Sequence, residues 1–343
     1  MSLTANLYPL LKPWLFRMDA ERAHEWTTRM MRFSHSLGLL TVGQEVLPQK
    51  PVECLGLRFP NALGLAAGMD KSASAVEAWA ALGFGFVEVG TLTPRPQPGN
   101  PKPRLFRLPE HDALINRMGF NNPGIHSAVK RLKKRRTQAV VGVNIGKNFD
   151  TPNEEAVNDY LLGLRAAYEV ADYIAVNISS PNTKGLRDLQ AEESIRSLLG
   201  ALKVEQAKLA KEQGQMKPVL VKIAPDLDGQ QIEALARVFN ELAVDGVIAT
   251  NTTISRVAVA GHPLEKEAGG LSGAPVKERS TDVIQAFRML LKESTPIIGV
   301  GGILSGADAA EKMKAGAQLV QVYSGLVFRG PGLVQDVLRT IGA

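Results

Sequence analysis

Apolar residues in the first forty positions recur at the spacing of helix faces. One stripe follows the i, i+3, i+4, i+7, i+8 pattern of a single helix face and comprises Leu7, Leu10, Leu11, Trp14 and Leu15. A second stripe runs over 23–37, between Asp19 as an expected N-cap and Gly38 as an expected stop. Residues 1–45 are therefore expected to form a small helical hairpin. It either packs on the main domain as ordinary structure or presents an apolar platform to lipid or to an apolar ligand.

From residue 60 onward, short apolar runs alternate with helical patterns, which is typical of βαβ units. Strands are expected near 63–67, 86–90, 140–145, 173–178, 219–223, 246–250, 297–301 and 319–323. Helices are expected near 73–82, 124–135, 154–170, 192–213, 229–243, 277–292, 306–315 and 332–341. Eight such pairs predict the α/β class and a (β/α)8 TIM barrel over residues 46–343. Two longer connections, 91–123 and 251–275, are expected to be binding loops or lids.

Composition is that of an ordinary globular protein, with 45% hydrophobic and 22% charged residues among 343. The net charge of +6 is mild, and the basic run over 130–136 has no interleaved aromatic residues, so a solvated helix end is favoured over nucleic-acid binding. A single cysteine, Cys54, excludes an internal disulfide and a cysteine-based metal site. Neither a spanning run of about 18 apolar residues nor a signal-peptide pattern is found, so no membrane span is expected.

Polar residues follow the C-terminal ends of the expected strands, where barrel enzymes build their active sites. In chain order these are Ala67, Gly68, Lys71, Thr91, Asn144, Asn177, Ser179, Ser180, Asn182, Thr183, Lys222, Thr250, Asn251, Thr252, Gly301, Gly302, Tyr323 and Ser324. Asparagine amides both donate and accept hydrogen bonds, so a ring of them suits a planar heterocycle better than a metal ion. Each asparagine taken alone is more often a turn-former, and only their coincidence at the strand ends favours a binding site.

Two glycine-containing pairs, Gly301-Gly302 and Ser324-Gly325, follow the seventh and eighth expected strands, where this fold commonly binds phosphate. Lys222 ends an apolar strand, so its ammonium needs either an ion-pair partner or a ring that becomes anionic, such as a reduced flavin. Ser180 has no histidine nearby in sequence to activate it, and the string around it could be a turn.

Five strings at these strand ends resemble dihydroorotate dehydrogenases of the membrane-associated, quinone-dependent class. They are Ala66-Ala67-Gly68-Met69-Asp70-Lys71, Asn116-Arg117-Met118-Gly119-Phe120-Asn121-Asn122, Asn177-Ile178-Ser179-Ser180-Pro181-Asn182-Thr183, Thr250-Asn251-Thr252-Thr253 and Gly299-Val300-Gly301-Gly302-Ile303. The resemblance spans essentially the whole chain. It implies an FMN flavoenzyme of de novo pyrimidine (UMP) biosynthesis, with one FMN per chain, that oxidises (S)-dihydroorotate to orotate and reduces a ubiquinone-type quinone.

The resemblance also implies residue roles. FMN would be held by Ala67, Gly68, Lys71, Thr91, Asn144, Asn177, Lys222, Thr250, Gly273, Gly302, Tyr323 and Ser324. Dihydroorotate would contact Lys71, Asn116, Arg117, Met118, Gly119, Phe120, Asn177, Asn182, Asn251 and Thr252. Ser180 would be the catalytic base, with Thr183 and Phe120 lining a proton exit. His24, Arg107 and Tyr323 would contact the quinone, framed by the hairpin.

The same resemblance implies peripheral contact with membrane lipid, on the cytoplasmic side of a bacterial inner membrane, and no bound metal. Soluble relatives that use fumarate or NAD carry cysteine at the position of Ser180 and lack the hairpin, so this sequence has both features of the quinone class. Other hypotheses are a soluble-type dihydroorotate oxidase, a phosphate-binding barrel isomerase and a non-catalytic membrane-surface protein. The barrel isomerase is disfavoured because the strand ends lack a matched acid and base.

Overall fold

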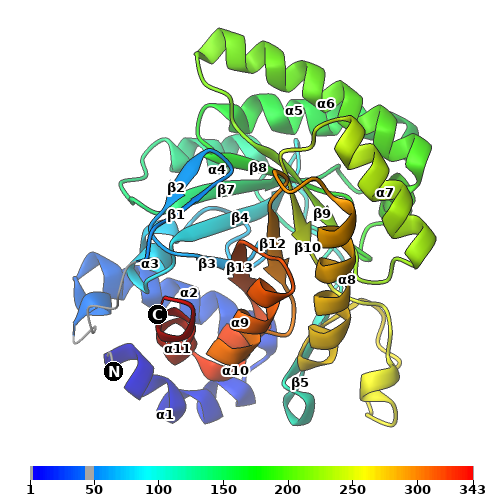
Figure 1. Cartoon of the computed structure of the whole chain (residues 1–343). Coiled ribbons are helices and arrows are strands. Elements are labelled where there is room, and N and C mark those ends of the chain that lie inside the picture. Colours follow the sequence, from blue (N-terminus) through cyan, green and yellow to red (C-terminus); the bar gives the residue numbers. More distant parts are fainter. Residues whose placement is uncertain (1–2, 43–49, 343) are drawn as a thin grey trace.

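The computed structural model describes residues 3–42 and 50–342 and contains the expected closed barrel (Figure 1). Its parallel strands pair in the order β10-β12-β13-β3-β4-β7-β8-β9. The strands are β3 (Leu63–Leu65), β4 (Phe86–Leu92), β7 (Val140–Ile145), β8 (Tyr173–Asn177), β9 (Val219–Ile223), β10 (Gly246–Ala249), β12 (Ile297–Val300) and β13 (Leu319–Val322). The sequence-based prediction of a (β/α)8 barrel is confirmed.

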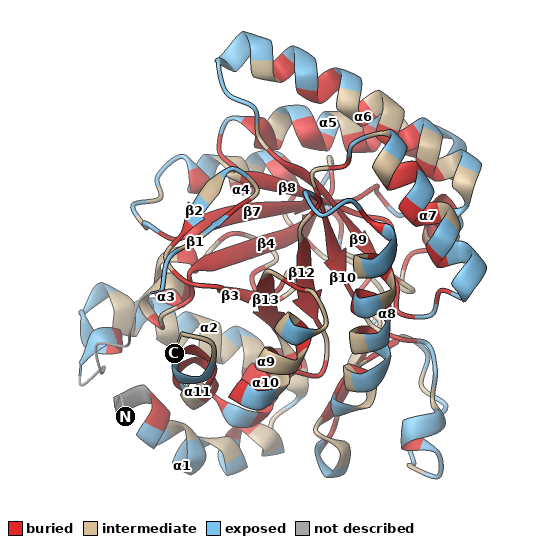
Figure 2. Ribbon diagram, in the orientation of Figure 1, coloured by how far each residue is buried: buried red, intermediate tan, exposed pale blue. Residues whose placement is uncertain are grey.

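Helices surround the barrel and bury the face turned toward it, whereas their outer faces are exposed (Figure 2). They are α3 (Val76–Ala81), α4 (Ile125–Leu132), α5 (Ala156–Tyr168), α6 (Glu192–Gln213), α7 (Gly229–Glu241), α8 (Lys277–Leu290), α9 (Gly306–Lys314), α10 (Ser324–Arg329) and α11 (Gly332–Ile341). Local signals set some ends: α7 begins with a capping box in which Asp228 and Gln231 satisfy each other's backbone N–H groups. The basic run over 130–136 lies at the end of α4, mostly exposed.

A short antiparallel hairpin, β1 (Val52–Cys54) and β2 (Leu57–Phe59), lies at the end of the barrel where the strands begin. Phe59 is fully buried, and its ring lies 5.3 Å from that of Phe86, the first residue of β4. Leu55, in the turn, approaches Gly246 at the start of β10. The hairpin therefore closes this end of the barrel and leaves the opposite end, formed by the carboxyl ends of the strands, for a site.

The expected N-terminal helices are present as α1 (Leu3–Arg17) and α2 (Ala20–Ser36). Asp19 is the N-cap of α2, since its Oδ1 accepts a hydrogen bond of 3.0 Å from the backbone N–H of Arg22. Gly38 follows α2 in the left-handed region, with φ of 70°. Both sequence-based signals are confirmed, whereas the expected boundary at residues 45/46 lies outside the described residues. In Figure 1 the two helices lie beside α10 and α11, away from α5 and α6.

The two long connections contain strands that the sequence pattern did not predict. β5 (Leu105–Leu108), β6 (Ala113–Asn116) and β11 (Gly270–Gly273) form an antiparallel sheet in the order β11-β6-β5. The expectation of binding loops or lids over 91–123 and 251–275 did not include these strands. The sheet places Asn116, at the end of β6, opposite Gly270, so it brings both connections to one edge of the barrel mouth. No helix in the described part of the chain is long and apolar enough to cross a membrane.

Candidate active site

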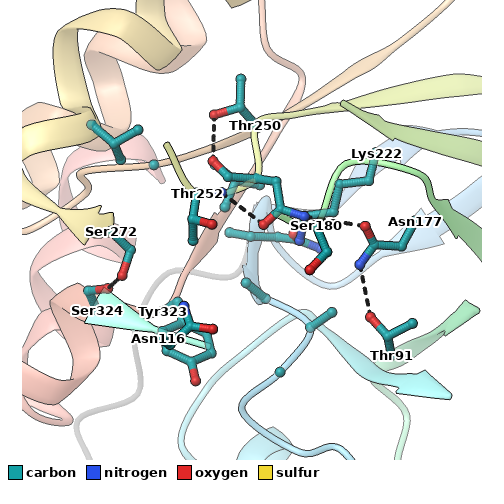
Figure 3. A pocket seen from close by; sticks show the side chains of 18 of the residues that line it. Thr91, Asn116, Asn177, Ser180, Lys222, Thr250, Thr252, Ser272, Tyr323 and Ser324 are labelled. Atoms are coloured by element: carbon teal, nitrogen blue, oxygen red, sulfur yellow. Dashed lines mark hydrogen bonds between the residues drawn. The ribbon is translucent and has the colours of Figure 1, made fainter. Parts of the chain in front are cut away.

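A pocket opens at the carboxyl ends of the barrel strands (Figure 3). Of the expected site residues, those that line it are Ala67, Gly68, Lys71, Thr91, Asn116, Met118, Gly119, Phe120, Asn177, Ser180, Asn182, Lys222, Thr250, Asn251, Thr252, Gly273, Gly301, Gly302, Tyr323, Ser324 and Gly325. Figure 3 shows Asn177, Ser180 and Lys222 on one side and Ser272 with Ser324 on the other. Residues from all parts of the barrel thus converge on one cavity.

A chain of side-chain amides and hydroxyls forms one wall of the pocket. Asn177 donates from Nδ2 to Thr91 Oγ1 at 2.9 Å, and Thr91 donates from Oγ1 to Asn144 Oδ1 at 2.6 Å. Asn251 donates from Nδ2 to Asn177 Oδ1 at 3.3 Å. Asn144 is fully buried behind Thr91 and does not itself line the pocket. Its described contacts therefore orient Thr91, which does.

Beneath this wall lies a buried carboxylate that the sequence analysis missed. Glu88, in the middle of β4, is fully buried and accepts hydrogen bonds from Asn144 Nδ2 at 2.8 Å, Tyr173 Oη at 2.9 Å and Gln321 Nε2 at 2.8 Å. Both carboxylate oxygens thus accept hydrogen bonds from side-chain amide groups. A lone acidic residue in an apolar strand was the available signal, and it parallels the one noted for Lys222.

The Lys222 ammonium interacts electrostatically with the Glu88 carboxylate. Its side chain is buried at the pocket wall, and within the described residues it has no hydrogen bond or ion pair. Burial lowers the pKa of Lys222, and the charge of Glu88 opposes that shift. A buried ammonium whose donors face a cavity is suited to an electron-rich ligand atom.

The loops after β6 and β8 meet at another side of the pocket. Asn182 donates from Nδ2 to Asn116 Oδ1 at 3.1 Å, and its backbone N–H donates to Ser180 Oγ at 3.2 Å. Lys71 lies nearby, and its Nζ donates a hydrogen bond of 2.7 Å to the Gly68 carbonyl. Burial lowers the pKa of Lys71 to about 8. This side of the pocket therefore combines a cation with amide groups, a combination that suits a carboxylated heterocycle.

Arg117, an expected substrate contact, does not line the pocket. Its guanidinium donates to Glu267 Oε2 at 2.5 Å and to the Pro103 carbonyl at 2.9 Å, and it lies over the ring of Phe106. These partners belong to the two long connections, so the side chain joins those connections to each other. Only the neighbours of Arg117 in the segment from Asn116 to Phe120 reach the cavity.

The far end of the pocket is formed by backbone and hydroxyl groups. Gly302 has φ of 68°, and a Cβ there would lie 2.4 Å from Lys277 Cα, so only glycine fits between the β12 loop and α8. The hydroxyl of Ser324, at the start of α10, is hydrogen-bonded to that of Ser272, with 2.8 Å between the two Oγ atoms. Ser272 lies on β11, and the sequence pattern predicts neither this strand nor the serine as part of the site. Backbone N–H groups in the first turn of a helix have no partner within that helix, which suits an anion.

A second, mainly apolar cavity lies between the helical hairpin and the barrel. Its lining comes from α1, α2, β5, β6 and α10 and includes Leu7, Leu11, Leu15, Phe16, Ala23, Trp26, Met30, Met31, Leu105, Leu114, Leu326 and Val327. Lys71, Met118 and Tyr323 line this cavity and the polar pocket alike. The two cavities therefore adjoin at these three residues.

His24 and Arg107, two of the expected quinone contacts, line the apolar cavity, and Tyr323 lines both cavities. Burial, with the charge of Lys71, lowers the pKa of His24 to about 4, so its ring is neutral at neutral pH. Arg107 donates to the backbone carbonyls of Leu15 and Met18 at the end of α1. Burial lowers the pKa of the Arg107 guanidinium and raises that of Tyr323 to about 12. The structure thus places a few polar groups in a mostly apolar chamber.

A buried ion pair holds the hairpin against the barrel. Glu21 on α2 accepts hydrogen bonds from Arg104 Nε at 3.1 Å and from Arg104 Nη2 at 2.7 Å. Lys102 Nζ lies 3.4 Å from Glu21 Oε1. Further contacts run from α1: Tyr8 Oη donates to the Val327 carbonyl at 2.5 Å, and Lys12 Nζ to the Phe328 carbonyl at 2.9 Å.

Within the described residues, no group of three or more His, Cys, Asp or Glu side chains could hold a metal ion.

Comparisons with known proteins agree on one family. Residues 50–343 match the family model described as dihydroorotate dehydrogenase. The chain is 57% identical to a dihydroorotate dehydrogenase (quinone) of Chromobacterium violaceum, over 97% of each chain. It is 55% identical to that of Methylobacillus flagellatus, over 98% of this chain and all of the relative. A crystal structure of DHODH from Eimeria tenella with ferulenol superposes with a TM-score of 0.87, at 38% identity over 94% of this chain and 90% of that one.

Proposed function

The chain belongs to the dihydroorotate dehydrogenase family, and we propose that it oxidises (S)-dihydroorotate to orotate and passes the electrons through FMN to a ubiquinone-type quinone. This reaction is a step of de novo pyrimidine biosynthesis. One observation carries the proposal: a polar pocket and an apolar cavity share Lys71, Met118 and Tyr323 as a common wall. These three side chains would therefore lie between a flavin held in the polar pocket and a quinone held in the apolar cavity.

Orphaned polar groups around the pocket suit FMN. Lys222 has no partner within the described residues, and the buried oxygens Gln321 Oε1, Asn182 Oδ1 and Thr252 Oγ1 accept no hydrogen bond there. FMN offers ring nitrogens and carbonyls at one end and a phosphate at the other. The proposed FMN contacts are Ala67, Gly68, Lys71, Thr91, Asn177, Lys222, Thr250, Gly273, Gly302, Tyr323 and Ser324, with Asn144 acting through Thr91. When bound, FMN supplies the hydride acceptor.

Substrate recognition is proposed at the side of the pocket formed by the loops after β6 and β8. The Lys71 ammonium attracts the carboxylate of dihydroorotate, and asparagine amides pair with the amide edges of its ring. The proposed contacts are Lys71, Asn116, Met118, Gly119, Phe120, Asn177, Asn182, Asn251 and Thr252. Arg117 supports this segment from outside, since its guanidinium binds Glu267.

Ser180 is proposed as the base that accepts the proton from C5 of dihydroorotate. Its Oγ accepts a hydrogen bond from the backbone N–H of Asn182, and its second lone pair takes the substrate proton while the hydroxyl releases its own proton toward the exit. The side chain is buried, and Thr183 Oγ1 close by in the chain has no hydrogen-bond partner within the described residues. Thr183 and Phe120 are proposed to line the exit by which the proton leaves. A hydroxyl base favours reaction at alkaline pH.

The apolar cavity is proposed as the quinone site, with His24, Arg107 and Tyr323 contacting the head group. Exposed apolar side chains gather on the hairpin, among them Leu10, Leu11 and Trp14, which are 75%, 43% and 48% exposed. Such a surface suits the acyl region of a bilayer and supports peripheral attachment. We place the protein on the cytoplasmic face of a bacterial inner membrane.

Replacement of the base tests this function. Ser180→Ala is expected to slow anaerobic flavin reduction by dihydroorotate by roughly 10²–10⁴-fold, the usual share of general-base catalysis. FMN content, read from the visible absorption spectrum, should not change. Ser180→Cys should retain more activity than Ser180→Ala because a thiolate can also accept the proton. A Ser180→Ala enzyme that is reduced as fast as wild type would refute the assignment of Ser180.

A further inference from the structure

Three loops at the mouth of the pocket meet at one arginine that does not line it. Arg187 lies in a short 3₁₀ helix, Leu186–Gln190, in the connection after β8. Its Nε donates to the Ser179 carbonyl at 3.0 Å, and its Nη2 donates to the Thr252 carbonyl at 2.8 Å. Its Nη1 donates to Asp226 Oδ2 at 2.7 Å. One planar guanidinium therefore joins the connections that follow β8, β9 and β10.

Asp226 extends the same assembly toward the antiparallel sheet. Its carboxylate accepts from the Thr253 hydroxyl and, through Oδ2, from the backbone N–H of Ile254 at 3.2 Å. Thr253 in turn exchanges two backbone hydrogen bonds with Leu271 of β11, at 3.0 and 2.8 Å. The Arg187 and Asp226 side chains are only 20% and 21% exposed, so this pair is shielded from competition by solvent.

The carbonyl that Arg187 binds belongs to the peptide unit that enters Ser180. Holding the Ser179 oxygen fixes the plane of that peptide, and Pro181 restricts the backbone on the other side of Ser180. Asn251 adds a second link between the same two loops, from its Nδ2 to Ser179 Oγ at 3.1 Å. The direction of the Ser180 hydroxyl is thus set by the backbone on both sides of it.

We propose that Arg187, held by Asp226, is a positioning residue that fixes the Ser180 hydroxyl relative to the substrate-contacting loop at Thr252. This inference rests on the proposed role of Ser180. It assigns no contact with substrate or flavin to Arg187. Its contribution is the geometry of proton removal, for which a displacement of about 1 Å costs about 100-fold in rate.

The requirement is for arginine rather than for any cation. Arg187 uses three directional donors in one plane to reach three acceptors on three loops. A lysine ammonium is a compact charge that can pair with Asp226 but cannot reach the Ser179 and Thr252 carbonyls in the same geometry. We therefore expect Arg187→Lys to behave more like Arg187→Gln than like wild type.

The kinetic test uses the FMN-loaded enzyme in both half-reactions. Arg187→Gln is expected to lower the rate of anaerobic flavin reduction at saturating dihydroorotate by about 10–100-fold. The binding constant for orotate, followed by its perturbation of the flavin spectrum, should change by less than about threefold, because ground-state contacts are kept. Reoxidation of dithionite-reduced enzyme by quinone should be unchanged. Asp226→Asn, which keeps one acceptor oxygen and removes the charge, should give a smaller loss and serves if Arg187→Gln does not fold.

Arg165→Gln is the matched control, because Arg165 forms a two-point ion pair with Glu205, at 2.7 and 3.0 Å, between helices α5 and α6. It should leave flavin reduction unchanged.

A double-mutant cycle with Ser180→Ala separates positioning from general support of the fold. If Arg187 acts through Ser180, Arg187→Gln should slow a Ser180→Ala enzyme by less than about twofold, since the group being aimed is gone. Losses that multiply in the double mutant, or wild-type reduction by both Arg187→Gln and Asp226→Asn, would overturn the inference. Failure of the proposed function looks different: Ser180→Ala alone would then be reduced at the wild-type rate.

Discussion

Glu21→Gln is expected to loosen the helical hairpin from the barrel and so to impair the quinone half-reaction selectively. Glu21 and Arg104 are each buried, with side chains 7% exposed, and they form a two-point ion pair across the interface. The substitution preserves the size of the side chain and removes its charge. Because the hairpin forms one wall of the apolar cavity, its displacement should disturb quinone binding more than dihydroorotate oxidation.

The magnitude follows from what Arg104 loses and what it keeps. Removing one partner of a buried ion pair typically costs about 3–5 kcal/mol. Arg104 retains hydrogen bonds to the carbonyls of Pro98 at 2.7 Å and Asn100 at 2.8 Å, and a glutamine keeps one acceptor oxygen. We therefore expect the lower end of that range. A loss of about 3 kcal/mol raises the population of detached hairpin by about two orders of magnitude.

The same pair gives a pH dependence of definite sign. Burial disfavours the charged Glu21, but the hydrogen bonds and charges of Arg104 and Lys102 outweigh burial and hold its pKa below the usual value of 4.5. Because the pKa is lower in the folded state, the stabilisation is complete above about pH 4.5 and is lost as the pH falls through the folded-state pKa. The wild-type hairpin should loosen in acid, whereas that of Glu21→Gln should show little further change.

Limited proteolysis of the hairpin and the two half-reactions, measured separately, form the assay. We expect faster cleavage within residues 3–42 and a lower kcat/KM for quinone, with flavin reduction unchanged at saturating dihydroorotate near pH 7. Saturation matters because Glu21 also helps to keep Lys71 charged. Glu25→Gln, an exposed change on the same helix, is the matched control. Equal cleavage rates and equal quinone kinetics in Glu21→Gln and wild type would refute the reasoning.

Three further predictions concern the flavin, the quinone and the membrane. Lys222→Met should lower the flavin midpoint potential by tens of millivolts, where about 30 mV equals 1.4 kcal/mol for a two-electron couple. Lys222→Arg should not restore the potential. An unchanged potential in Lys222→Met would show that Lys222 has only a structural role. Because burial keeps the pKa of His24 near 4, quinone turnover should show no inflection near pH 6.5; one that disappears in His24→Asn would contradict this. Replacing Leu11 and Trp14 by glutamate should weaken vesicle binding in sedimentation assays, by up to about 1.5–3 kcal/mol per buried side chain, and equal binding would exclude their contact with lipid.

The barrel could be predicted from sequence because its parallel strands are buried on both faces and appear as continuous apolar runs. The additional strands could not be predicted in this way. β1 and β2 have three residues each, and β11 consists of Gly270, Leu271, Ser272 and Gly273. Such segments are too short to show an alternation, and their pairing comes from distant partners such as Asn116 in β6. Tertiary context, rather than local propensity, forms this sheet.

The candidate site was predictable to the extent that strand ends in a barrel converge. Asn177, Lys222 and Thr250 follow separate strands, and the fold alone brings them to one pocket. Glu88 and Arg187 were missed for a different reason. Neither lines the cavity, and the importance of each comes from hydrogen bonds to residues far away in sequence, which only coordinates reveal. Sequence identifies groups that face a ligand more readily than groups that hold those in place.

The central claim is that one chain couples dihydroorotate oxidation in the polar pocket to quinone reduction in the adjoining apolar cavity. The most direct measurement mixes the FMN-loaded protein anaerobically with dihydroorotate, follows bleaching of the flavin, and then adds a ubiquinone analogue, fumarate or NAD in separate experiments. We expect bleaching by dihydroorotate and rapid return of the flavin absorbance with the quinone alone. No bleaching by dihydroorotate, or reoxidation by fumarate or NAD as fast as by the quinone, would contradict it.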